Sequence, residues 1–224
     1  MALLERQLGE RPAGCGAAGL TPGQRGLKRA FDLVVSLLLL ALLLPVILLA
    51  AWAAARDTGA SGFFLQERIG RGGQPFRVVK LRTMRPLAGS TVTTLGDPRI
   101  TRFGRLLRRS KLDELPQLFN VLAGQMSFVG PRPDVPGFAD ALGDEERVIL
   151  SVRPGITGPA TLKYRNEEAL LAGVAAPERY NREVIFPDKV RLNRDYVRHW
   201  SFTMDLVYLW RTVFPAPYRE KTDA

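Results

Sequence analysis

The sequence predicts a mainly α-helical chain with a small β part (α+β) that is attached to a membrane. Three observations predict it: an uncharged apolar segment from Leu33 to Ala55, two apolar runs around the turn signal GRGG, and apolar residues at helical spacing further along the chain. With 224 residues and 46% hydrophobic content, the chain can fill one core. We expect a disordered tail over residues 1–24, a membrane helix over 25–57, and a globular domain with interfacial helices over 58–224.

The composition points to an anionic partner and excludes several kinds of site. A formal net charge of +10 suits nucleic acid, a phospholipid surface, or a small substrate with several phosphates. The chain has one cysteine, Cys15, and one histidine, His199. Intramolecular disulfides, Cys-rich metal sites and most Ser-His or Cys-His nucleophiles are therefore excluded. We expect His199 to be an ordinary surface residue.

The apolar segment reads LVVSLLLLALLLPVILLAAWAAA from Leu33 to Ala55. As one helix it would be roughly 35 Å long, enough to cross a hydrocarbon core of about 30 Å. It is too long, and its leading region is too long, for a cleaved signal peptide. Pro45 withholds a backbone N–H in mid-segment, where it kinks or breaks a helix.

Lys and Arg residues flank the segment in equal numbers, so no positive-inside bias sets an orientation. The flanking cations are Arg25, Lys28 and Arg29 before it, and Arg56, Arg68 and Arg71 after it. Two structures fit: a kinked helix that spans the bilayer, or a helix that breaks at Pro45 and leaves by the face it entered. From the residues alone the spanning helix is the simpler, because membrane helices tolerate proline.

The region after the membrane segment predicts a hairpin and then an amphipathic helix. Apolar runs on both sides of GRGG, between Phe63 and Met84, are typical of a β-hairpin. The stretch ITRFGRLLRR predicts a helix with a basic outer face that is solvated or lies on anionic lipid. Its apolar residues are Ile100, Phe103, Leu106 and Leu107, and its outward arginines are Arg102, Arg105 and Arg109.

Two adjacent acids, Asp113 and Glu114, follow this row of bases in RLLRRSKLDELPQLFN. Ser110 could cap a helix that contains them, or the helix could begin near Pro116 with the acids just before it. In both cases the positive end of a helix and the nearby cations favour the ionised carboxylates. The acids would then serve as counter-charges or as working groups.

Two other arginines lie in stiff turns. Arg132 stands between Pro131 and Pro133, and Arg153 precedes Pro154. Fixed guanidinium groups suit bidentate recognition of phosphate.

The C-terminal stretch YVRHWSFTMDLVYLWRTVF carries apolar residues at helical spacing, which fits either a helix packed on the core or one docked at a membrane interface. The spaced residues are Phe202, Leu206, Leu209, Trp210 and Val213, and the side chains favoured at an interface are Trp200, Tyr208 and Trp210.

Four stretches taken in order resemble the bacterial sugar transferases known as monotopic phosphoglycosyl transferases, in their minimal form. They are KRAFDLVVSLLLLALLLPVILLA, QERIGRGGQPFRVVKLRTM, DPRITRFGRLLRRSKLDELPQLFNVLAGQMSFVGPRP and RPGITG. The resemblance implies a proline-broken re-entrant membrane helix with both ends in the cytoplasm, at the bacterial inner membrane. It also implies transfer of a phospho-sugar from a nucleotide diphosphate sugar, a UDP-sugar, to polyprenyl phosphate, which releases UMP and starts surface glycan or exopolysaccharide assembly.

The same resemblance assigns roles to individual residues. Asp113 is similar to the family's nucleophile, which forms a covalent phospho-sugar intermediate, and Glu114 to its ligand for Mg²⁺. The resemblance also implies phosphate contacts for four cations, which are Lys80, Arg108, Arg132 and Arg153. A metal and fixed cations would offset the repulsion between an anionic nucleophile and a diphosphate.

Three rival functions remain at this point. A non-catalytic, membrane-anchored scaffold would use the acids only as counter-charges. A glycosyltransferase would release UDP in place of UMP. Nucleic-acid binding is suggested only by the net charge, and the apolar segment and the acids within the basic patch argue against it. We therefore expect a lipid bilayer, polyprenyl phosphate and a nucleotide sugar as partners, and no nucleic acid.

Overall fold

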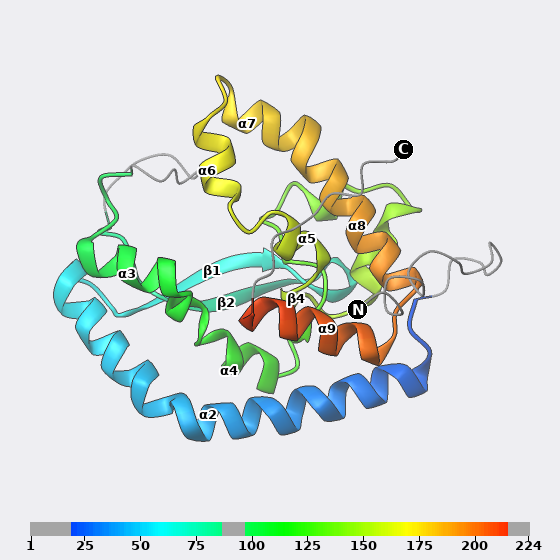
Figure 1. The fold of residues 1–224 in the computed structure, drawn as a ribbon, viewed down its shortest axis with the longest axis horizontal. Coiled ribbons are helices and arrows are strands. Elements are labelled where there is room, and N and C mark those ends of the chain that lie inside the picture. Colours follow the sequence, from blue (N-terminus) through cyan, green and yellow to red (C-terminus); the bar gives the residue numbers. More distant parts are fainter. Residues whose placement is uncertain (1–18, 87–96, 215–224) are drawn as a thin grey trace.

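A computed structural model of the protein describes residues 19–86 and 97–214, and Figure 1 shows it as a ribbon. Cys15 lies outside the described residues. The α-helices are α2 (Pro22–Thr58), α3 (Arg102–Ser110), α4 (Gln117–Leu122), α5 (Pro159–Lys163), α6 (Glu167–Ala172), α7 (Pro177–Tyr180), α8 (Phe186–Arg198) and α9 (Phe202–Val213). The strands are β1 (Phe63–Ile69), β2 (Pro75–Leu81), β3 (Ser127–Val129) and β4 (Gly155–Thr157). The shorter helical segments are η1 (Arg71–Gly73), η2 (Leu112–Glu114), η3 (Ala139–Ala141), η4 (Glu146–Ser151) and η5 (Asn181–Ile185). The predicted mainly α fold with a small β part is confirmed.

Helix α2 is continuous through Pro45 and bends about midway along its length (Figure 1). Pro45 has no N–H to donate to the carbonyl of Ala41, and its ring crowds that carbonyl, which accounts for a bend. The expected break is therefore a bend within one helix. The helix also begins earlier than expected, at Pro22, where Thr21 and Gln24 form a capping box.

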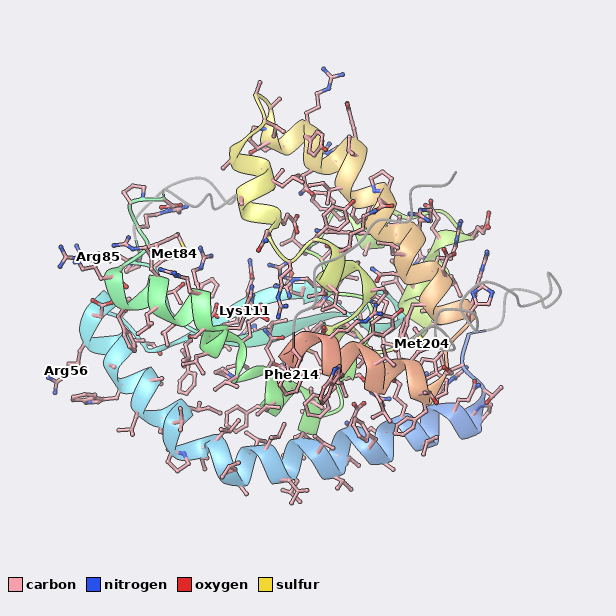
Figure 2. All side chains as sticks on the ribbon, viewed as in Figure 1. Arg56, Met84, Arg85, Lys111, Met204 and Phe214 are labelled. Carbon is pink, nitrogen blue, oxygen red and sulfur yellow. The ribbon has the colours of Figure 1, made fainter. Side chains whose placement is uncertain are left out.

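Both arms of α2 pack on the same domain, while its middle is mostly exposed. The N-terminal arm buries Lys28, Asp32 and Ser36, and the C-terminal arm buries Ala51, Ala54 and Thr58. It is the one helix, among the described residues, that is long and apolar enough to cross a membrane, and only 17% of its most apolar window is buried. Beyond that window, Arg56 lies 4.8 Å above the Trp52 ring and points away from the domain (Figure 2).

The N-terminal arm is attached through buried polar groups. Lys28 Nζ donates to Asp205 Oδ2 at 2.5 Å, which ties α2 to α9. Asp32 Oδ1 accepts hydrogen bonds from Ser127 Oγ and the Phe128 backbone N–H, both at 3.1 Å, which ties α2 to β3. Such groups are buried at little cost only because each has a partner.

Strands β1 and β2 form the predicted antiparallel hairpin, in register from Phe63 opposite Leu81 to Ile69 opposite Pro75. Gly72 and Gly73 in its turn have φ of 71° and 78°, a region that glycine enters without strain. Side chains alternate between the two faces of a strand. Arg68, opposite Phe76, and Lys80, opposite Phe64, therefore lie on the same face of the hairpin.

Strands β3 and β4 pair in parallel, with Ser127 opposite Gly155 and Val129 opposite Thr157, and their backbones come very close at Gly155 and Gly130. A Cβ on Gly155 would stand 2.1 Å from the backbone nitrogen of Gly130, so both positions need glycine. Arg153 lies two residues before β4, and the loop that follows β3 carries Arg132. The close pairing therefore fixes the backbone positions from which the side chains of Arg132 and Arg153 extend.

Helix α3 ends at Ser110, so Ser110 is not the N-cap of a following helix. Its hydroxyl donates to the Leu106 carbonyl at 2.8 Å, a contact within the helix it terminates. The other expectation is confirmed, since α4 begins at Gln117 directly after Pro116 and the acids precede it. The expected apolar face is wrong at Leu106, which is 59% exposed, whereas Leu107 is buried.

Asn120 attaches α4 to the free edge of the hairpin. Its Oδ1 accepts the Val79 N–H at 3.0 Å, and its Nδ2 donates to the Arg77 carbonyl at 2.7 Å and to Gln125 Oε1 at 2.7 Å. The buried amide thus replaces a neighbouring strand for β2. It sets the position of α4 relative to the strand that carries Lys80.

The C-terminal stretch forms α9 only from Phe202, because Ser201 caps it by accepting the Met204 N–H. Trp200 is buried and donates to Asp205 Oδ2, so at this residue the alternative of packing on the core holds. Trp210 is 64% exposed, as the alternative of an interfacial position requires. His199 is exposed at the end of α8, as expected.

Candidate functional site

The two acids lie in η2, at a sharp change of chain direction. Lys111, between α3 and η2, has φ of 58°, the only positive φ at a non-glycine residue in the described part of the chain. A residue with a Cβ pays on the order of 1 kcal/mol or more for this conformation, and such strain often marks a functional turn. This change of direction leads the chain from α3 toward α4, so that Asp113 and Glu114 lie between the two helices.

Glu114 is held by two cations from different elements. Arg132 Nη2 donates to Glu114 Oε1 at 2.8 Å, and Lys80 Nζ lies 3.7 Å from the same oxygen. Burial would raise the pKa of Glu114, but the charges of Arg132 and Lys80 outweigh it and lower the pKa to about 2. Glu114 is therefore ionised at any physiological pH.

Asp113 has a different environment. Its Oδ1 is buried and, among the described residues, has no hydrogen-bond partner. Burial raises the pKa of Asp113, and the adjacent charge of Glu114 raises it further. Lys80, Lys111 and Arg108 act in the opposite direction, and the net shift is upward. The prediction that nearby cations favour the ionised form holds for Glu114, whereas the net shift at Asp113 favours its protonated form.

Four of the six predicted site residues belong to one cluster, and a fifth acts on it from α3. Asp113, Glu114, Lys80 and Arg132 interact as described above. Arg108, in the last turn of α3, lowers the pKa of Asp113. A basic residue there also interacts favourably with the negative end of the helix.

Arg153 lies elsewhere. Its Nε donates to the Gly124 carbonyl at 2.7 Å, just after α4, where Arg29 donates to the carbonyls of Val121 and Leu122. Helix α4 is about 9 Å long, so Arg153 holds the end of α4 opposite to the dyad that Asp113 and Glu114 form. Burial and the charge of Arg29 lower the pKa of Arg153. Arg153 and Arg29 therefore form a basic group separate from the cluster around Glu114.

Arg68 is a residue of the cluster that the sequence did not single out. Its Nη1 donates to the carbonyl of Pro133 at 3.2 Å, next to Arg132, and its Nη2 donates to Gln66 Oε1 at 2.7 Å. Burial, and then the charge of Arg132, lower the pKa of Arg68 to about 10. Alternation along the strands places Arg68 on the same face as Lys80. The sequence therefore carries a signal for Arg68 once the turn of the hairpin has been located.

The acids fit a metal bound together with substrate. In the described ranges, no three His, Cys, Asp or Glu side chains gather to hold a metal ion alone. Mg²⁺ is commonly held by one or two carboxylates together with substrate phosphates. The buried, unpartnered Oδ1 of Asp113 and the ionised Glu114 are a donor set of that kind.

Comparison with known proteins places the chain beside sugar transferases. A family model described as bacterial sugar transferase matches residues 23–216. The chain is 40% identical over 192 residues to the UDP-glucose:undecaprenyl-phosphate glucose-1-phosphate transferase of Caulobacter vibrioides, a match that covers 83% of this chain and 68% of that protein.

Two further relatives differ in length from each other. The protein of the same name from Escherichia coli (strain K12) is 37% identical over 201 residues, which cover 85% of this chain but only 40% of that protein. The exopolysaccharide production protein ExoY of Sinorhizobium fredii is 33% identical over 204 residues, 83% of each chain. The chain therefore spans about two fifths of the longer relative.

Lys80 should make anion binding at this site depend on pH. Burial, and then the charge of Arg132, lower the pKa of Lys80 to about 8, although Glu114 opposes the shift. Its charge is lost as the pH rises through about 8, so the affinity for inorganic pyrophosphate, measured by calorimetry, should fall over that interval. The Lys80→Arg variant keeps its charge and should keep its affinity.

A rise in pH affects the stability of the fold in the opposite direction to the affinity for the anion. The unfolded chain holds the Lys80 proton up to its ordinary pKa of 10.5, so the native state binds fewer protons between about pH 8 and 10.5. The contribution of Lys80 to stability thus rises over that range.

Equal loss of pyrophosphate affinity above pH 8 in wild type and in Lys80→Arg would contradict the assignment of the pH dependence to Lys80.

Proposed function

Because the chain belongs to the bacterial sugar transferase family, we propose that it transfers a phospho-sugar from a nucleotide diphosphate sugar, a UDP-sugar, to polyprenyl phosphate. The products are UMP and a polyprenyl diphosphate sugar, the first lipid-linked unit of a surface glycan or exopolysaccharide. The observation that carries the proposal is the contrast between its two acids. Glu114 is engaged by two cations, while the neighbouring Asp113 has a buried oxygen that nothing engages in the described part of the chain.

Asp113 is the proposed nucleophile. An oxygen of its carboxylate attacks the β-phosphorus of the donor, and the bond from that phosphorus to the bridging oxygen breaks, so UMP leaves with the electron pair. A phosphate oxygen of the acceptor then attacks the same phosphorus, and the bond to Asp113 breaks. The carboxylate is regenerated and no proton or electron is required in the balance.

The ionised form of Asp113 is the attacking one, and its raised pKa makes that carboxylate more basic than an ordinary aspartate. An oxygen without hydrogen bonds keeps its lone pairs available for attack, whereas Glu114, bound by Arg132, does not. Bringing an anionic carboxylate to an anionic diphosphate is the main obstacle to phosphoryl transfer. Lys80, Arg132 and Arg108 supply the positive charge that reduces this repulsion.

We propose that Mg²⁺ would be held by Glu114 together with the donor diphosphate. When bound, Mg²⁺ would neutralise the charge on the diphosphate oxygens. Glu114 suits this role, since its carboxylate is ionised.

We further infer that α2 enters and leaves the membrane by the same side, at the cytoplasmic face of the inner membrane. Its two arms both bury residues against the one globular domain, and the exposed apolar middle lies between them. A helix with both ends fixed to one domain cannot place those ends on opposite sides of a bilayer. The bend at mid-helix supports the same arrangement (Figure 1).

The reaction is tested by the nucleotide released. Detergent-purified protein, polyprenyl phosphate, Mg²⁺ and a panel of UDP-sugars should yield UMP with at least one sugar. Asp113→Asn should lower the rate by about a hundredfold or more at unchanged folding, since fixed groups in contact with the reacting atoms typically contribute that much. Asp144→Asn, a change at an exposed acid, should leave the rate unchanged. Release of UDP would make the protein a glycosyltransferase, and release of neither nucleotide would favour a scaffold.

The topology is tested by cysteine labelling. In a Cys15→Ser background, Gly26→Cys and Ser61→Cys place single thiols at the two ends of α2. Both should react with a membrane-impermeant maleimide only after the inner membrane is opened. Labelling of one end in intact spheroplasts would mean that α2 spans the bilayer.

A further inference from the structure

Arg68 is a half-buried cation that lacks a close counter-ion. Its guanidinium is held by neutral acceptors, the Pro133 carbonyl and Gln66 Oε1. No carboxylate oxygen in the described residues lies within 4.0 Å of it, whereas Arg132 and Lys80 both reach Glu114. Asp134 and Glu114 act on Arg68 only as more distant charges.

This arrangement is costly in the free protein. A charge withdrawn in part from water is unfavourable when no group of opposite charge lies close to it. Arg68 carries the further cost of a second guanidinium, that of Arg132, which destabilises its charged form. Two like charges held together in this way form a site that an anion would complete.

The hairpin positions this pair relative to the dyad. Lys80 and Arg68 occupy the same hairpin face, and four residues of strand separate their levels, roughly 13 Å. Arg132 lies between them, since it donates to Glu114 beside Lys80 and belongs to the same loop as Pro133, which Arg68 contacts. The cations thus follow one another in the order Lys80, Arg132 and Arg68.

We propose that Arg68 and Arg132 form a second phosphoryl-oxygen site beside the dyad, which binds a phosphate group other than the one that Asp113 attacks. The assignment rests on the proposed function for the identity of the ligand. Two phosphates of the same chemistry are present in that reaction, the α-phosphate of the donor and the phosphate of the lipid acceptor. Arg68 is a binding residue in either case, because its guanidinium would contact the substrate.

The site itself is tested without turnover, by the binding of inorganic pyrophosphate to the purified protein. Arg68→Gln should weaken binding roughly 10- to 100-fold, the effect of one charge-assisted contact. Arg77→Gln is the matched control, because Arg77 stands on the opposite face of the same hairpin and is exposed. It should bind as wild type does, and Arg68→Lys should fall between the two.

Stability separates binding from a structural role. Removal of a half-buried charge without a close carboxylate should leave the unliganded melting temperature of Arg68→Gln equal to or above that of wild type. A lower melting temperature with unchanged pyrophosphate affinity would overturn the proposal, and Arg68→Lys, which keeps the charge, allows the same comparison if Arg68→Gln does not fold.

The source of the phosphate is read from steady-state kinetics of UMP release. An increased KM for the UDP-sugar alone assigns the site to the donor, and an increased KM for polyprenyl phosphate alone assigns it to the acceptor. Wild-type values for both substrates would overturn the proposal. If wild type releases no UMP, the proposed function fails, while the pyrophosphate measurement still decides whether the anion site exists.

Discussion

The position of α4 is the constraint on which the candidate site depends. At one end, Arg29 of the membrane helix binds its last carbonyls and Arg153 binds the Gly124 carbonyl just after it, and along its length Asn120 joins it to the edge of β2. The dyad precedes the first turn of this short helix, so these contacts decide which groups Asp113 and Glu114 meet. Too short to be stable alone, α4 owes its existence to them. The membrane helix is therefore part of the support of the site.

Once α4 is placed, the two acids are separated by their surroundings. One faces the Arg132 loop and Lys80, and its pKa falls to about 2, while the other is buried beside that charge and its pKa rises. Adjacent residues of one type thereby acquire different chemistry, which is how paired carboxylates commonly divide their roles. The distinction arises from three elements distant in sequence, the hairpin, η2 and the loop after β3. The fold is in this sense a means of bringing their charges together.

The local features of the fold could be predicted from the sequence because they follow from local chemistry. The apolar segment, the hairpin at GRGG and the start of α4 directly after Pro116 each have a signal within a few residues. Ser110 was misread because Lys111 adopts a left-handed conformation that no residue preference predicts, so that α3 ends where a helix start was expected. The sequence could not decide between the core and an interface for Trp200, because its contact with Asp205 is set by tertiary packing.

The candidate site could be predicted only in part, because only some of its residues have a signal in the nearby sequence. The two acids stand out because they are adjacent, and Arg132 because prolines flank it, whereas the roles of Arg153 and Arg68 depend on where distant backbone carbonyls lie.

We propose above all that Asp113 itself takes the phospho-sugar. The most direct test incubates the protein with the UDP-sugar and Mg²⁺ in the absence of acceptor, and measures the mass of the peptide that contains Asp113. One phospho-sugar attached at Asp113, and transferred when polyprenyl phosphate is added, is the predicted result. An unmodified peptide, from protein that still releases UMP when the acceptor is present, would contradict it.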